Sequence, residues 1–145
     1  MKKEVYSVQR IGTVISPHKN LSNIPRQPSE ASGIGGKVII EPQFVAGLQD
    51  LEGFSYIYLI CFLHRVKEYQ LTVTASFDNK PHGVFATRAP GRPNPISVSV
   101  VKLISRNGNV LIIENVDLLD GTPVLDIKPY VTADNINTKS LAKNL

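Results

Sequence analysis

The stretch from Ile96 to Leu119, "ISVSVVKLISRNGNVLIIENVDLL", decides the fold of this chain. Two runs rich in valine and isoleucine flank Arg106-Asn107-Gly108, and an Asn-Gly pair between two such runs is the strongest short-range signal for a β-hairpin. The pattern predicts a long antiparallel hairpin.

Other β-rich runs surround this hairpin. Strands are predicted at residues 5–15, 37–42, 55–66, 70–77 and 122–131. We expect the runs at 55–66 and 70–77 to pair with each other. Apolar spacing in "QFVAGLQDLEGF", residues 43–54, predicts one short helix. The fold class is therefore all-β: a small antiparallel β-barrel with one short helix and long functional loops.

Length and composition limit the classes of protein to which this chain can belong. The chain has 145 residues, 42% of them hydrophobic and 19% charged, which suits one globular domain. We expect a barrel domain at 1–131 and a polar tail at 132–145. No apolar run approaches the ~18 residues of a membrane span and no signal-peptide core is visible, so we expect no membrane contact and a cytoplasmic location. The net charge of +4 permits attraction to nucleic acid without requiring it.

Most familiar site signatures are absent from the sequence. There is no phosphate-binding P-loop, no dinucleotide fingerprint, no serine nucleophile elbow, and no Cys/His spacing that would predict a metal site. The single cysteine, Cys61, lies in the apolar run "YIYLICFL" and is predicted to be a core residue. Chemistry supplied by a bound cofactor is the better enzyme hypothesis.

The segment "ATRAPGRPNP", residues 86–95, is rigid and charged. Its three prolines fix φ near −65°, and Arg88 and Arg92 could both face one cavity as forked donors for a carboxylate or phosphate. Asn94 adds a neutral donor and acceptor. The arginines could equally be solvated loop charges, and this segment alone leaves the two readings open.

A second polar pattern lies in "DLLDGTPVLDIKPY", residues 117–130. Asp126, Lys128 and Tyr130 alternate on one face of the predicted strand, and Leu125 and Ile127 lie on the other. Such a pattern is typical of the solvated face of a sheet.

Taken in order, four segments carry a family resemblance: "IPRQPS", "LEGFSYIYLICFLHR", "GVFATRAPGRPNPISVSVVKL" and "DLLDGTPVLDIKPYV". Together they resemble the β-barrel S-adenosylmethionine-dependent tRNA methyltransferase family, over nearly the whole chain from Val8 to Val131. The resemblance implies a homodimeric barrel that binds S-adenosylmethionine and methylates N6 of threonylcarbamoyladenosine beside the anticodon, with a tRNA anticodon stem-loop as partner.

The resemblance also implies the site. The cofactor-binding residues carried over are Arg26, Gln27, His64, Arg65, Arg88, Val98, Leu125, Asp126, Ile127 and Lys128. Arg92 and Asn94 match the motif as substrate-binding residues. Asp126 and Tyr130 are the candidates for the catalytic proton acceptor, because an exocyclic adenine amine needs help to lose its proton. Scattered lysines and arginines could contact RNA phosphates: Lys2, Lys3, Arg10, Lys19, Lys37 and Lys80.

This sequence departs from the family pattern at Ala89 and Gly91, where many relatives carry "RSPFRPNP", and at Ser97, where relatives commonly have glycine. Two alternatives stay open beside tRNA methylation. One is a methyltransferase that acts on a small molecule or protein. The other is a non-catalytic β-barrel that binds RNA or a nucleotide.

Overall fold

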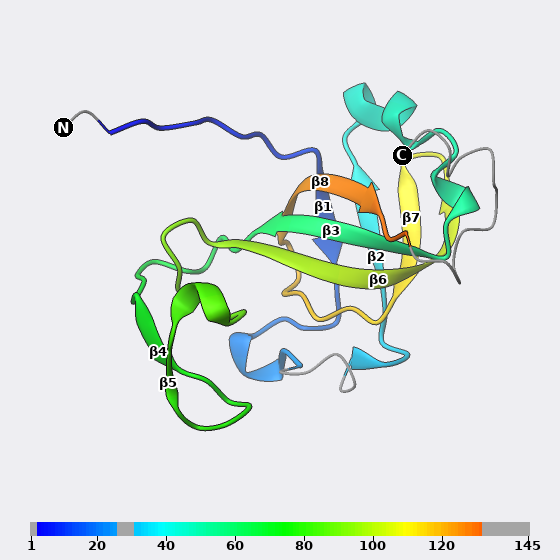
Figure 1. The fold of residues 1–145 in the computed structure, drawn as a ribbon. Helices are drawn as coiled ribbons and strands as arrows, with labels where there is room; N and C mark the ends of the chain where they lie inside the picture. Colours follow the sequence, from blue (N-terminus) through cyan, green and yellow to red (C-terminus); the bar gives the residue numbers. More distant parts are fainter. Residues whose placement is uncertain (1–2, 26–30, 132–145) are drawn as a thin grey trace.

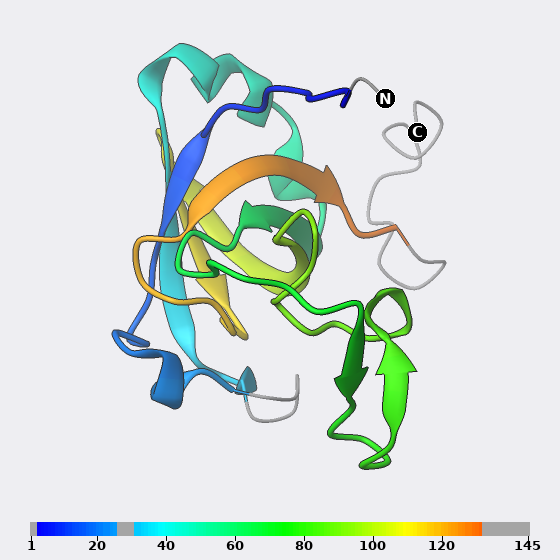
Figure 2. The same ribbon diagram turned by 90° about the vertical axis from the view of Figure 1, so that its left-hand side faces the viewer.

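Six antiparallel strands close into a barrel (Figures 1 and 2). The computed structural model describes residues 3–25 and 31–131. Around the barrel the order is β1, β2, β7, β6, β3, β8. Their bounds are β1 (Gly12–Ile15), β2 (Gly35–Ile40), β3 (Tyr56–Phe62), β6 (Ile96–Asn107), β7 (Val110–Glu114) and β8 (Pro123–Pro129). The predicted all-β barrel is confirmed, and the predicted tail at 132–145 lies outside the described residues.

The central hairpin forms where the sequence predicts it. β6 and β7 pair antiparallel, with Asn107 opposite Val110, and Gly108 takes the positive φ of 62° that the tight turn needs. The strands predicted at 37–42 and 122–131 are β2 and β8. The strand predicted at 5–15 begins only at Gly12, and residues 3–10 extend away from the barrel (Figure 1).

The predicted pairing between the runs at 55–66 and 70–77 is wrong. β3 pairs with β6 on one side and β8 on the other. The second run contributes only β4 (Thr72–Thr74), which pairs with β5 (Pro81–Gly83) in a separate two-stranded sheet outside the barrel (Figures 1 and 2). The reason is burial: β3 alternates fully buried residues with half-buried ones, whereas none of the three β4 residues is buried.

The predicted short helix is two 3₁₀ helices, η3 (Pro42–Leu48) and η4 (Leu51–Gly53). Asp50, at a φ of 70°, separates them. The apolar spacing still buries Leu48 in the core, where Phe44 and Leu51 pack against it. The remaining helices are the 3₁₀ turns η1 (Leu21–Asn23) and η5 (Val84–Ala86). Within residues 3–25 and 31–131, no helix is long and apolar enough to cross a bilayer.

One apolar core fills the barrel. Its fully buried members come from all six strands and include Val14, Val38, Ile57, Leu59, Cys61, Val101, Leu111, Ile113 and Val124. Burial raises the pKa of the Cys61 thiol to about 12, and the negative charge of Asp117 adds to the effect. Cys61 is thus a core residue, as predicted, and stays protonated at neutral pH.

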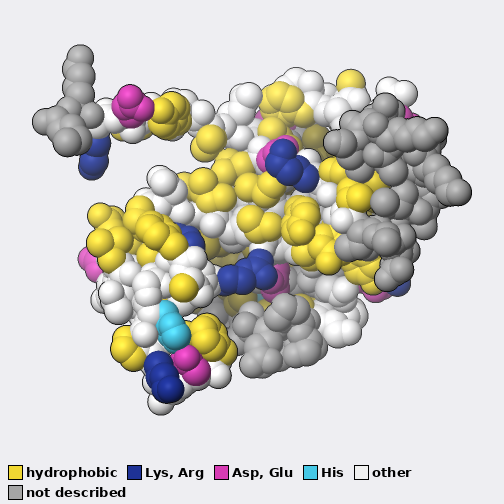
Figure 3. Space-filling model, in the orientation of Figure 1, with side chains coloured by type: hydrophobic (Ala, Val, Ile, Leu, Met, Phe, Trp, Pro, Cys, Tyr) yellow, Lys and Arg dark blue, Asp and Glu magenta, His cyan; other side chains and the backbone are white. Residues whose placement is uncertain are grey.

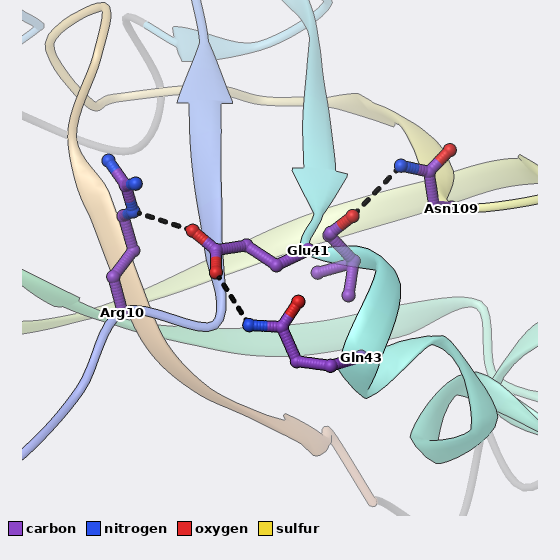
Figure 4. A network of polar contacts seen from close by, with 5 residues as sticks. Arg10, Glu41, Gln43 and Asn109 are labelled. Atoms are coloured by element: carbon purple, nitrogen blue, oxygen red, sulfur yellow. Dashed lines mark hydrogen bonds and ion pairs between the residues drawn. The ribbon is translucent and has the colours of Figure 1, made fainter.

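The two ends of the barrel differ. At the hairpin end, Arg10 and Gln43 both donate to the Glu41 carboxylate, at 3.0 and 3.1 Å, and the Asn109 amide donates to the Ile40 carbonyl at 2.9 Å (Figure 4). The opposite end, the loop end, carries the connections at 16–34, 63–95 and 115–122. Seven of the thirteen candidate site residues fall within the first two of these connections in the sequence, and none falls within 115–122.

Candidate functional site

Three neighbouring strands bring predicted site residues into one row near the loop end. Val98 of β6 pairs with Ile60 of β3, and Ile60 pairs with Asp126 of β8. Neighbouring strands lie about 4.8 Å apart, so Val98 and Asp126 are about 10 Å from each other across the outer face. One ligand of nucleoside size can contact both.

Arg88 reaches this row from the proline loop. Its guanidinium donates a hydrogen bond to the carbonyl oxygen of Val98, and its side chain is otherwise exposed. A neutral carbonyl is a weaker partner for a guanidinium than a carboxylate. An anionic ligand group beside Val98 can therefore take over the Arg88 donors.

The Arg92 side chain makes different contacts from the Arg88 side chain. Its Nη1 donates to the carbonyl oxygens of Thr87 and Ala89, at 3.1 and 3.0 Å, so the side chain folds back onto its own loop. Because those contacts lie inside residues 87–92, Arg92 holds the loop in shape. Asn94 is exposed beyond it, and its carbonyl accepts from the Ile96 amide at 2.7 Å.

His64 and Arg65 lie beside the proline loop. They form the exposed corner of a turn in which the Val66 amide donates to the Leu63 carbonyl at 3.1 Å. The Leu63 amide donates to the carbonyl of Pro95 at 2.7 Å. This bond ties the turn to the end of the proline loop, so the two predicted segments are brought together. Arg26 and Gln27 lie outside the described residues.

A β-bulge shapes the β8 part of the site. Ile60 pairs with Asp126 but Cys61 pairs with Val124, so Leu125 is an extra residue in the ladder. β8 also pairs with β1 only through Pro123 and Val124. From Leu125 onward the strand therefore has an edge whose backbone groups have no ladder partner in β1.

The side chains of β8 separate into two faces. The Asp126 carboxylate contacts Lys128 Nζ at 3.1 Å and accepts from the Ile127 amide at 2.9 Å, while Ile127 packs against the core. The Tyr130 ring contacts Tyr58 edge-on, with ring centroids 5.2 Å apart. Four residues of strand place Tyr130 about 13 Å from Asp126. These two candidate proton acceptors therefore do not share one position.

Two buried polar atoms lie at the loop end without a hydrogen-bond partner within the described residues: Ser97 Oγ and Asp117 Oδ1. Sequence reasoning gave neither a role. Ser97 is opposite Cys61 in the ladder, and the charge of Asp117 acts on the Cys61 thiol. Buried polar atoms normally have a hydrogen-bond partner. These two oxygens are therefore available to bond a polar ligand group or an ordered water.

The rest of the loop end is firmly bonded. Asp120 accepts from the Ser16 amide and from Lys19, both at 2.9 Å, and these contacts, with the Lys19 hydrogen bond foremost, lower the pKa of its carboxyl. His18 Nε2 lies 2.9 Å from the Val116 carbonyl. Across the described ranges, no group of three or more His, Cys, Asp or Glu residues could hold a metal ion.

The fold and this set of residues define a small β-barrel whose loop end brings the cationic Arg88 close to the bulged start of β8. Residues 13–135 match the model of the tRNA-methyltransferase O N-terminal domain. The chain belongs to that family.

Individual relatives agree with the family model. The chain is 50% identical over 139 residues to a "Probable S-adenosyl-L-methionine-binding protein" of Pyrococcus abyssi, covering 93% of this chain and 76% of the relative. It is 36% identical to the tRNA (adenine(37)-N6)-methyltransferase of Escherichia coli, covering 87% of this chain and 58% of that protein. The crystal structure of TrmO from Pseudomonas aeruginosa has a TM-score of 0.74 at 40% identity and matches 92% of this chain, which spans 62% of the solved one.

Proposed function

We propose that this chain is an S-adenosylmethionine-dependent methyltransferase that methylates N6 of threonylcarbamoyladenosine beside the tRNA anticodon. The observation that carries the proposal is the convergence at the loop end of His64, Arg65, Arg88 and Val98 with the bulged start of β8. The name of the 36% identical Escherichia coli relative supports the substrate. We infer that the protein acts in the cytoplasm, where tRNA is modified.

The residues present fit the cofactor's chemistry. Arg88 would bind its carboxylate as a forked donor, and backbone groups of Leu125 to Lys128 on the edge free of β1 would read its adenine. His64, Arg65 and Val98 would line the same site, and Arg26 and Gln27 would complete it. When bound, S-adenosylmethionine supplies an electrophilic methyl group. The protein's task is then alignment of the acceptor nitrogen and removal of its proton.

We assign proton removal to Asp126. It lies in the row of Val98, whereas Tyr130 is about 13 Å further along β8 with its ring against Tyr58. Lys128 holds the Asp126 carboxylate in place and would offset its negative charge. An Asp126→Asn variant should keep S-adenosylmethionine binding within about threefold and lose most methyl transfer, at least about a hundredfold, which is typical for a general base.

A second copy of the chain is the proposed partner for the outer face of β3 and β6. Phe62, Ile96 and Val100 are exposed there, Phe62 lies opposite Ile96 in the ladder, and none of the three is charged. Homodimer interfaces are more apolar than ordinary surface. Val100→Lys should convert a dimer to a monomer in light scattering, whereas Ile39→Lys, an equally exposed isoleucine on β2, should not. A wild-type monomer at micromolar concentration would refute the homodimer.

Calorimetric titration with S-adenosylmethionine tests the cofactor site. Arg88→Ala should weaken binding about tenfold, or about 1.4 kcal/mol, because one charge-assisted contact is lost. Arg106→Ala is the matched control, since Arg106 pairs with Glu52 at 3.1 Å near the other end of β6. No heat from the folded wild-type protein would refute the methyltransferase and favour a non-catalytic RNA-binding or nucleotide-binding barrel. Cofactor binding without any affinity for tRNA would favour a small-molecule or protein substrate.

A further inference from the structure

We propose that the lobe formed by residues 69–86 is a single-stranded RNA platform that holds the substrate's loop beside the methyl-transfer site. The lobe consists of β4, β5, η5 and the turns between them, and it projects from the barrel (Figures 1 and 2). The inference rests on the proposed function, because it names what this part of the chain does for that substrate.

The lobe exposes several large apolar side chains. Its buried side chains are only Ala75 and Val84, whereas Tyr69, Leu71, Phe77 and Phe85 are 57%, 61%, 70% and 76% exposed. Hydrophobic side chains gather on the lobe in the space-filling view (Figure 3). Unpaired bases stack on exposed aromatic side chains such as Tyr69, Phe77 and Phe85.

One aromatic ring is already held in position. Phe77 lies against His82, with ring centroids 5.1 Å apart and planes 37° apart. His82 Nε2 is in turn fixed by Asp78 Oδ2 at 2.7 Å. A base that stacks on Phe77 therefore meets a ring that already contacts a neighbouring side chain, which limits the side-chain freedom lost on binding.

Charge favours RNA over a protein partner. The lobe itself carries Lys80 and Asp78 and is neutral, but the segments that flank it within residues 63–95 add Arg65, Lys67, Arg88 and Arg92 against Glu68. Asp78 is occupied by His82 and by the Lys80 amide at 3.0 Å. A polyanion with exposed bases matches a lobe that exposes aromatic rings between two basic flanking segments.

The lobe is connected directly to the site. Its base is bonded to the proline loop, with the Gln70 amide donating to the Gly91 carbonyl at 3.3 Å. A hollow of about 250 Å³ lies at this junction, lined by Glu68, Tyr69, Gln70, Val73 and Gly91. Gly91 has no side chain to fill it, and an added Cβ would lie 3.1 Å from the Glu68 carbonyl. RNA bound to the lobe would therefore lie next to the proline loop that carries Arg88.

Binding of a fluorescein-labelled anticodon stem-loop, measured by anisotropy, tests the platform. Phe77→Ala should weaken binding at least about fivefold, which corresponds to about 1 kcal/mol per stacked base, and Phe77→Tyr should restore most of it. Tyr6→Ala is the matched control, since Tyr6 is 81% exposed but lies outside the lobe. It should change binding by less than about twofold.

The outcomes separate this inference from the proposed function. If Phe77→Ala and Phe85→Ala both bind the stem-loop as the wild type does, the platform is refuted while the cofactor titration still stands. If the same variants change the oligomeric state and not RNA affinity, the lobe is a protein interface and the inference is equally overturned. The RNA-binding assay contains no S-adenosylmethionine. A defect in the cofactor site would therefore change neither RNA affinity nor oligomeric state in this assay.

Discussion

The hairpin end and the loop end of this barrel are built on opposite principles. At the hairpin end a two-residue turn joins β6 to β7, and Glu41 and Asn109 take part in a satisfied polar network (Figure 4). At the loop end Arg88 and His64 are exposed, and Ser97 and Asp117 each keep a buried atom without a partner in the described chain. The hairpin end is closed by satisfied polar contacts, and the loop end is the one to which we assign ligand binding.

The contrast between barrel and lobe gives the largest expected effect. Leu59→Ala removes a fully buried side chain from the core and should lower the free energy of unfolding by about 2 to 5 kcal/mol. Leu71→Ala removes the same group from the lobe, where it is 61% exposed, and should change stability by about 0.5 kcal/mol or less. Urea unfolding followed by circular dichroism measures both, and equal losses would contradict the separation of lobe from core.

The polar groups of the two ends give the next effect. Asn109→Ala breaks the bond to the Ile40 carbonyl and should cost about 1 kcal/mol. Ser97→Ala removes a hydroxyl that has no protein partner, so stability should stay equal or rise by up to about 1 kcal/mol. The same urea experiment decides, and a clear loss from Ser97→Ala would mean that the hydroxyl is already satisfied.

The smallest effect is a pH dependence at the loop end. Hydrogen bonds from Lys19 and the Ser16 amide hold the pKa of Asp120 below its ordinary value of 3.8. A lowered folded-state pKa contributes stability that is complete above that ordinary value and disappears as the pH falls through the folded pKa. Wild type should therefore lose more stability than Asp120→Asn between about pH 6 and pH 3, by under about 1 kcal/mol because the pair is partly exposed. Urea unfolding at the two pH values measures this difference. Equal losses of stability in the wild type and in Asp120→Asn would show that Asp120 does not cause the pH dependence.

Local patterns in the sequence predicted what is local in the structure. Asn107-Gly108 gave the hairpin, the apolar run around Cys61 predicted its burial, and the alternation after Asp126 gave the two faces of β8. The pairing of β3 with β6 and β8 was missed because partners distant in sequence are selected by the shared core, which no short window contains.

The site was predictable only in part for the same reason. Arg88 and Arg92 carry identical chemistry in the sequence, and only the folded loop shows that Arg92 bonds its own carbonyls while Arg88 reaches Val98. The unpartnered atoms of Ser97 and Asp117 leave no trace in composition or spacing. The one sequence signal concerned Ser97, which is a serine where the family that the chain resembles commonly has glycine.

The most direct test of the central claim is transfer of a labelled methyl group from S-adenosylmethionine to an anticodon stem-loop. The substrate should carry threonylcarbamoyladenosine, with an otherwise identical stem-loop carrying adenosine as the control. We predict transfer to N6 of the modified nucleoside, little to the control, loss of transfer in Asp126→Asn, weaker transfer at limiting S-adenosylmethionine in Arg88→Ala, and no change in Arg106→Ala. A folded wild-type protein that binds S-adenosylmethionine and both RNAs yet transfers no methyl group would contradict the account.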